Sequence, residues 1–125
     1  MTGRITVLVA DDDKATRTLL NRYLTSMGYE VIEAADGAQA QALAVARRPD
    51  IILLDIFMPG KDGIEALKEL APKMPGTSFL IITGGENEAG AQECLVWGAD
   101  DYILKPLDME AVGRAIKTRL LLRGL

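Results

Sequence analysis

Residues 51–55 read Ile-Ile-Leu-Leu-Asp, four apolar side chains in succession followed by an acid. A strand that is apolar on both of its faces is typical of the centre of a parallel sheet with helices on either side. Directly after such a strand, a carboxylate is costly to bury unless it has a partner. The stretch therefore predicts a buried central strand that presents a functional carboxylate, Asp55.

Short apolar runs alternate with helical patterns on both sides of this stretch. Further strands are predicted over residues 5–10, 29–34, 79–82 and 102–104. Helices are predicted over about residues 15–27, 37–47, 64–70, 87–97 and 109–122. Gly28 and Gly98 are suited to end two of these helices, and Asp108 is suited to begin the last. Five strand–helix units predict an α/β fold whose parallel sheet is covered by helices on both faces.

The composition fits one compact domain. The chain has 125 residues, of which 49% are apolar, which is enough for one core and leaves no room for a second domain of ordinary size. The net charge is −4 and no basic cluster is visible, which argues against direct nucleic-acid binding. No apolar stretch approaches the roughly 18 residues of a membrane span. We therefore expect a single domain over residues 1–125 that binds neither nucleic acid nor membrane.

The chain has one cysteine and no histidine. Cys94 cannot form an internal disulfide, which agrees with a cytoplasmic location, and we expect it to be a small buried apolar residue. Without histidine, this sequence cannot supply a phosphohistidine, a Ser-His-Asp triad or a histidine-ligated zinc.

Polar side chains follow four of the five predicted strands. Residues 11–13 are three aspartates after the first strand, and Asp55, Thr83 and Lys105-Pro106 follow the third, fourth and fifth strands. Because ligands of such sheets bind outside the carboxyl ends of the strands, we expect these groups to meet at one edge. Taken singly, the first acids could simply cap a helix, Thr83 could be an ordinary strand residue and Lys105 a solvated lysine.

The ordered set resembles the receiver domain of two-component response regulators, over essentially the whole chain. The resemblance rests on the acid pair, on Asp55 with Met-Pro-Gly-Lys-Asp-Gly behind it at residues 58–63, on the threonine and on the Lys-Pro pair. It implies a flavodoxin-like (βα)5 fold with strand order 2-1-3-4-5. It also implies that Asp55 accepts a phosphoryl group from a phosphohistidine of a sensor histidine kinase or a histidine phosphotransfer protein.

The resemblance further implies a Mg²⁺ site. Asp12, Asp55 and the backbone carbonyl of Phe57 would be direct ligands, and Asp11 would act through water. Such a set agrees with the preference of Mg²⁺ for carboxylate and carbonyl oxygens.

Three more features follow from the resemblance. Lys105 and Thr83 would bind the phosphoryl oxygens, and the Lys105-Pro106 bond would be cis. Thr83 and Tyr102 would act as a switch that changes the surface of the fourth helix, fifth strand and fifth helix. That surface would bind a downstream protein or an attached output domain.

Two other functions fit parts of the pattern. A haloacid-dehalogenase-like phosphatase also uses an aspartyl nucleophile with Mg²⁺, but it usually needs a second aspartate two residues later, where this chain has Phe57. A receiver-like module that binds without phosphorylation usually lacks one of the acids or the lysine. We therefore expect a signalling domain without turnover of an external substrate. The leucine-rich end at residues 119–125 leaves open a frayed end, a homodimer contact or a helix that leads into an output domain.

Overall fold

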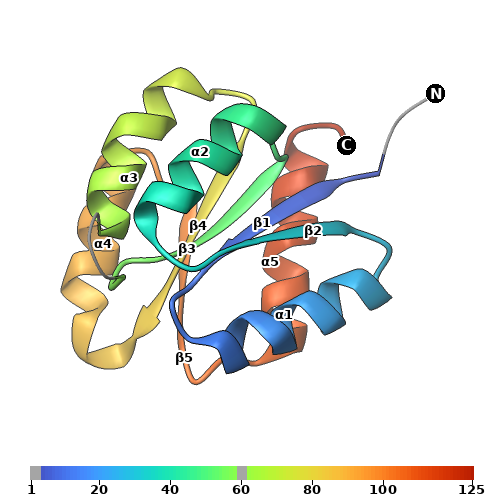
Figure 1. Cartoon of the computed structure of the whole chain (residues 1–125), viewed down its shortest axis with the longest axis horizontal. Helices are drawn as coiled ribbons and strands as arrows, with labels where there is room; N and C mark the ends of the chain where they lie inside the picture. The colour runs from blue at the N-terminus through green and yellow to red at the C-terminus, as the bar shows by residue number, and fades with distance from the viewer. Residues whose placement is uncertain (1–3, 59–61) are drawn as a thin grey trace.

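The computed structural model describes residues 4–58 and 62–125. Its core is a five-stranded parallel sheet in the order β2-β1-β3-β4-β5, which confirms the predicted fold class and strand order (Figure 1). The strands are β1 (Thr6–Ala10), β2 (Glu30–Ala34), β3 (Ile51–Asp55), β4 (Ser78–Gly84) and β5 (Asp101–Lys105). The helices are α1 (Lys14–Ser26), α2 (Gly37–Arg47), α3 (Gly63–Leu70), α4 (Glu88–Val96) and α5 (Met109–Leu122).

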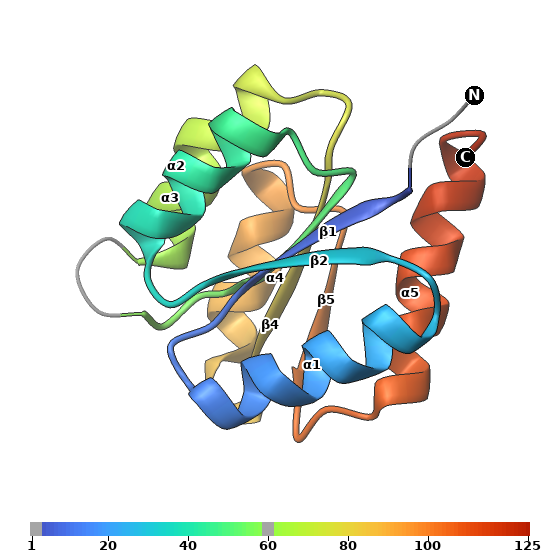
Figure 2. The same ribbon diagram turned by 45° about the vertical axis from the view of Figure 1, so that its right-hand side comes forward.

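Helices cover both faces of the sheet. The two views together show α1 and α5 on one face and α2, α3 and α4 on the other (Figure 2). Along β3, Ile51 and Leu53 pack in the cluster under α1 and α5, whereas Ile52 and Leu54 pack under the other three helices. All of β3 is buried, as expected of a strand with apolar residues on both faces.

Local signals set the helix ends. The side chains of four aspartates accept hydrogen bonds from backbone N–H groups in the first turns of α1, α2, α3 and α5, namely those of Asp13, Asp36, Asp62 and Asp108. Gly28 and Gly98, which follow α1 and α4, have φ values of 92° and 112°. These left-handed conformations confirm the predicted helix ends.

The strands reach further than the apolar pattern indicated. Asp55 is the last residue of β3, Thr83 lies within β4 and Lys105 ends β5, where residues after the strands were expected. Parallel pairing continues to these positions, with Asp55 beside Ile82 and Gly84 beside Lys105. Two short 3₁₀ segments, Ala71–Lys73 and Gly85–Asn87, were not predicted. Residues 59–61 of the Met-Pro-Gly-Lys-Asp-Gly motif lie outside the described residues.

The end of the chain is packed against the sheet. α5 runs to Leu122, as predicted, and Leu120 is buried while Leu121 and Leu122 are exposed. After the helix, Arg123 donates to the Ser78 hydroxyl oxygen at 2.6 Å and to the Pro75 carbonyl oxygen at 3.1 Å. These bonds argue against a frayed end.

Cys94 is fully buried, as predicted, and burial raises the pKa of its thiol to about 11. Within the two described ranges, no helix is long and apolar enough to cross a membrane.

Candidate functional site

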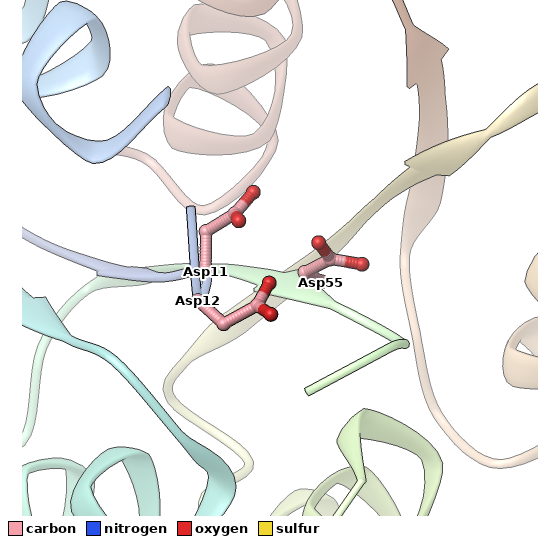
Figure 3. A group of neighbouring side chains, drawn as sticks. All are labelled: Asp11, Asp12 and Asp55. Carbon is pink, nitrogen blue, oxygen red and sulfur yellow. The ribbon is translucent and has the colours of Figure 1, made fainter. Parts of the chain in front are cut away.

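Three acidic side chains gather at the carboxyl edge of the sheet. Asp11 and Asp12 project from the turn after β1, and Asp55 projects from the end of β3 (Figure 3). Carboxylate oxygens of the three lie within 4.8 Å of one another. Asp11 and Asp55 are buried, whereas Asp12 is exposed. The sheet thus brings Asp55 next to Asp12, which lies 43 residues earlier in the sequence.

The buried carboxylate of Asp11 has fixed partners. Its Oδ1 accepts a hydrogen bond from the backbone N–H of Asp13 at 2.9 Å, and its Oδ2 lies 2.9 Å from the ammonium nitrogen of Lys105. By contrast, no hydrogen bond or ion pair joins the Asp12 carboxylate to another described residue. Asp12 therefore has its oxygens available for a ligand.

Lys105 bridges the two buried acids. Its Nζ donates to Asp55 Oδ2 at 3.0 Å and lies equally close to Asp11. Burial alone would lower the pKa of Lys105, but its bonds to both carboxylates outweigh burial and raise that pKa. The Lys105-Pro106 peptide bond is cis. The ammonium group is therefore held, charged, at the centre of the acidic cluster.

The surroundings of Asp55 disfavour its charged form. Burial raises its pKa, and the nearby charge of Asp11 adds to this effect; the hydrogen bonds from Lys105 and from the Phe57 backbone N–H act in the opposite direction without cancelling it. The charged form of Asp55 is thus less favourable in the folded protein than in the unfolded chain.

We expect Asp55→Asn to raise the melting temperature by a few degrees in metal-free buffer at neutral pH. A raised carboxyl pKa means that the folded state loses stability as pH rises through that pKa, and the neutral amide does not incur this loss. The gain should shrink as pH falls through the raised pKa and disappear well below the ordinary carboxyl value of about 3.9, where Asp55 is protonated in both states. Thermal denaturation of both proteins across this pH range measures it, and a variant that melts lower at neutral pH would contradict it.

Thr83 contributes a buried hydroxyl group to the same edge. The residue is 1% exposed, and its Oγ1 has no hydrogen-bond partner among the described residues. A buried hydroxyl group without a partner is unfavourable, so it indicates a place for a ligand. It faces an open hollow of about 630 Å³, lined by Asp12, Asp55, Phe57, Thr83, Gly84, Glu86, Asn87, Lys105 and Pro106.

Tyr102 stands apart from the acids. Its ring packs against the core beneath α2, α3 and α4, and its hydroxyl group donates to Glu88 Oε2 at 2.8 Å. Glu88 is the first residue of α4, so this bond joins β5 to the start of that helix.

Sequence reasoning did not identify Glu88 as a partner of Tyr102, nor Glu86 and Asn87 as residues that line the hollow. Glu86 and Asn87 could have been found, because they belong to the loop after a strand that already carried Thr83. The Glu88 contact had no signal in the sequence, since an acid at the start of a helix is ordinary.

Comparisons with known proteins agree on one family. The family model for the response regulator receiver domain matches residues 7–117. The chain is 38% identical over 114 residues to the alkaline phosphatase synthesis transcriptional regulatory protein PhoP of Bacillus subtilis, covering 91% of this chain and 48% of that protein. It is 35% identical over 106 residues to a cyclic di-GMP phosphodiesterase of Thermotoga maritima, covering 85% of this chain and 28% of that protein.

Solved structures show the same likeness. A CheY-like response regulator receiver domain protein of Methanospirillum hungatei superposes with a TM-score of 0.89 at 30% identity, covering 98% of each chain. The chemotaxis protein CheY4 of Vibrio cholerae gives a TM-score of 0.86 at 31% identity, covering 94% of this chain and all of that one. The chain spans about half the length, or less, of the curated relatives named above. By sequence and by structure, it belongs to the response regulator receiver domains, the phosphoacceptor domains of two-component signalling systems.

Proposed function

We propose that Asp55 of this receiver accepts the phosphoryl group, from a phosphohistidine on a sensor histidine kinase or a histidine phosphotransfer protein. The observation that carries the proposal is the arrangement around this residue. A nearly buried carboxylate, 4% exposed, ends the central strand, with the Lys105 ammonium at 3.0 Å and the partnerless hydroxyl of Thr83 on the same hollow.

The acidic cluster fits a Mg²⁺ ion. In the proposal, Asp12, Asp55 and the backbone carbonyl of Phe57 are direct ligands and Asp11 acts through water. The close carboxylate oxygens and the unpartnered Asp12 support this assignment, because Mg²⁺ prefers hard oxygen donors. When bound, the ion supplies positive charge that neutralises phosphoryl oxygens.

Three residues of the chain have separate roles in the transfer of the phosphoryl group. An Asp55 carboxylate oxygen forms the bond to phosphorus while the bond from phosphorus to the imidazole nitrogen of the donor breaks. Lys105 and Thr83 hold phosphoryl oxygens, through the ammonium group and the hydroxyl group respectively. Positioning and charge neutralisation carry most of the acceleration in such a transfer.

Signalling follows from the movement of Thr83 toward the phosphoryl group. In the proposal, Tyr102 turns with it, and its bond to Glu88 breaks, which releases the start of α4. The surface of α4, β5 and α5 thereby changes its affinity for a partner, by a shift between two conformations. The expected partner is a downstream protein or an attached output domain, and a second copy of the chain is a further candidate.

Receiver domains of response regulators act with histidine kinases and output domains, and they are signalling domains. We propose that residues 1–125 form a single receiver domain in the cytoplasm, without turnover of an external substrate.

The test is the intact mass of the protein after incubation with acetyl phosphate, with and without Mg²⁺. The wild type is expected to gain one phosphoryl group only with Mg²⁺, and Asp55→Asn to gain none. Asp101→Asn makes the same chemical change at an exposed acid that begins β5, and it should behave as the wild type. Phosphorylation of Asp55→Asn at the wild-type level would contradict the assignment of Asp55.

A further inference from the structure

Arg17 lies on α1, outside the acidic cluster, and its side chain makes two directed contacts. Its Nη1 donates to the backbone carbonyl oxygen of Asp11 at 2.7 Å, and its Nε donates to Glu33 Oε1 at 3.2 Å. Only 15% of the Arg17 side chain is exposed. A long, mostly covered arginine with both ends of its guanidinium engaged has little freedom to move.

The second contact is itself supported from α1. Glu33 Oε2, on β2, accepts a hydrogen bond from the Asn21 side-chain amide at 2.7 Å, and Thr25 donates to Asn21 Oδ1 at 2.9 Å. Together these bonds form a chain along the α1–β2 side that ends at the Asp11 carbonyl. Glu33 therefore orients the guanidinium rather than competing for it.

The carbonyl that Arg17 holds belongs to the peptide unit between Asp11 and Asp12. A peptide unit is planar, so fixing that carbonyl also fixes the nitrogen and the Cα of Asp12. The other polar groups of Asp11 are held by different elements: its N–H donates to the Ala34 carbonyl oxygen at 3.1 Å, and its carboxylate accepts from the Asp13 N–H. Asp12 has no such support, since its carboxylate bonds to no other described residue.

From this geometry we infer that Arg17 is a positioning residue for Asp12: by holding the Asp11–Asp12 peptide plane, it directs the exposed carboxylate toward Asp55. The inference rests on the proposed Mg²⁺ site at Asp12 and Asp55. Arg17 itself does not touch the metal, and it acts through the backbone. Residues that orient metal ligands in this indirect way typically change metal affinity by about 10- to 100-fold when they are removed.

The experiment is Mg²⁺ titration of the metal-free protein by calorimetry, for the wild type, Arg17→Ala and Arg22→Ala. Arg22 is an exposed arginine of the same helix, so its removal changes the net charge equally without touching the turn. We expect Arg17→Ala to weaken Mg²⁺ binding about tenfold and Arg22→Ala to leave it unchanged. Glu33→Gln keeps the guanidinium but weakens its anchor, so its loss of affinity should fall between these two.

The outcomes separate this inference from the proposed function. Removing either arginine makes the protein more negative, which by itself favours Mg²⁺ binding, so equal losses of affinity in Arg17→Ala and Arg22→Ala would show a disturbance of α1 as a whole and overturn the positioning role. A lower melting temperature with unchanged Mg²⁺ affinity would show a purely structural role and overturn it as well. A wild type that binds no Mg²⁺ would overturn the metal site first, and the role of Arg17 with it. If Arg17→Ala does not fold, Glu33→Gln is compared with Glu30→Gln, which removes the same negative charge from the exposed start of β2, and a loss of Mg²⁺ affinity in Glu33→Gln alone supports the positioning role.

Discussion

Gly63→Ala is expected to cost about 3 kcal/mol of stability or to prevent folding altogether. A Cβ atom at this position would overlap the backbone carbonyl oxygen of Asp55 and lie 2.8 Å from the Cα of Ile56. Both neighbours are main-chain atoms at the end of the buried central strand, so neither can turn aside as a flexible side chain would. The Gly63 N–H also donates to the Ile56 carbonyl oxygen at 2.9 Å, which holds the start of α3 at this close approach.

Chemical denaturation followed by circular dichroism measures the effect. Gly76→Ala is the matched control, because a Cβ atom built there meets nothing within 4 Å, and its midpoint should stay close to that of the wild type. If the free energy of unfolding of Gly63→Ala lies within about 0.5 kcal/mol of the wild-type value, the close packing of α3 on the backbone of Asp55 is wrong. If the variant folds, its Asp55 must have shifted, and phosphorylation by acetyl phosphate should slow.

The fold could be predicted from sequence because its signals are local and mutually consistent. The run from Ile51 to Leu54 is apolar without interruption, which already indicates a strand covered on both sides. The glycines after α1 and α4 and the aspartates before α1 and α5 marked helix ends to within one or two residues. Strand ends were predicted less well, because Asp55, Thr83 and Lys105 are polar and yet continue the parallel pairing.

Site residues near the carboxyl ends of strands could be predicted from the sequence, because the topology brings those positions together. Contacts made from the sides of helices were not found. Arg17 and Glu88 are ordinary surface residues by pattern, and their partners, the Asp11 carbonyl and the Tyr102 hydroxyl, are set by how α1 and α4 pack on the sheet. The requirement for glycine at position 63 likewise depends on how closely α3 approaches the end of β3, which no local sequence pattern indicates.

Lys105→Met is expected to destabilise the metal-free protein by about 2 kcal/mol and to increase the stabilisation that Mg²⁺ provides. The ammonium group lies 2.9 Å from Asp11 and 3.0 Å from Asp55, and removing it leaves two buried carboxylates without their counter-charge. The loss of stability should be smaller than for a fully buried ion pair, because 27% of the Lys105 side chain is exposed to solvent. A metal ion bound at Asp12 and Asp55 would restore positive charge to the cluster. Because the variant has more uncompensated negative charge than the wild type, the ion should stabilise the variant more.

The measurement is the melting temperature of wild type, Lys105→Met and Lys117→Met, each with and without millimolar Mg²⁺. Lys117 is an exposed lysine of α5 and controls for the loss of one charge. The increment from Mg²⁺ should be largest in Lys105→Met and equal in the other two proteins. Equal increments in all three would mean that the ammonium and the metal do not share the same carboxylates, and the proposed ligand set would have to move away from Asp55. A larger increment in Lys105→Met alone would show that lysine and metal offset the same charge, which is what a site built to receive a phosphoryl group between them requires.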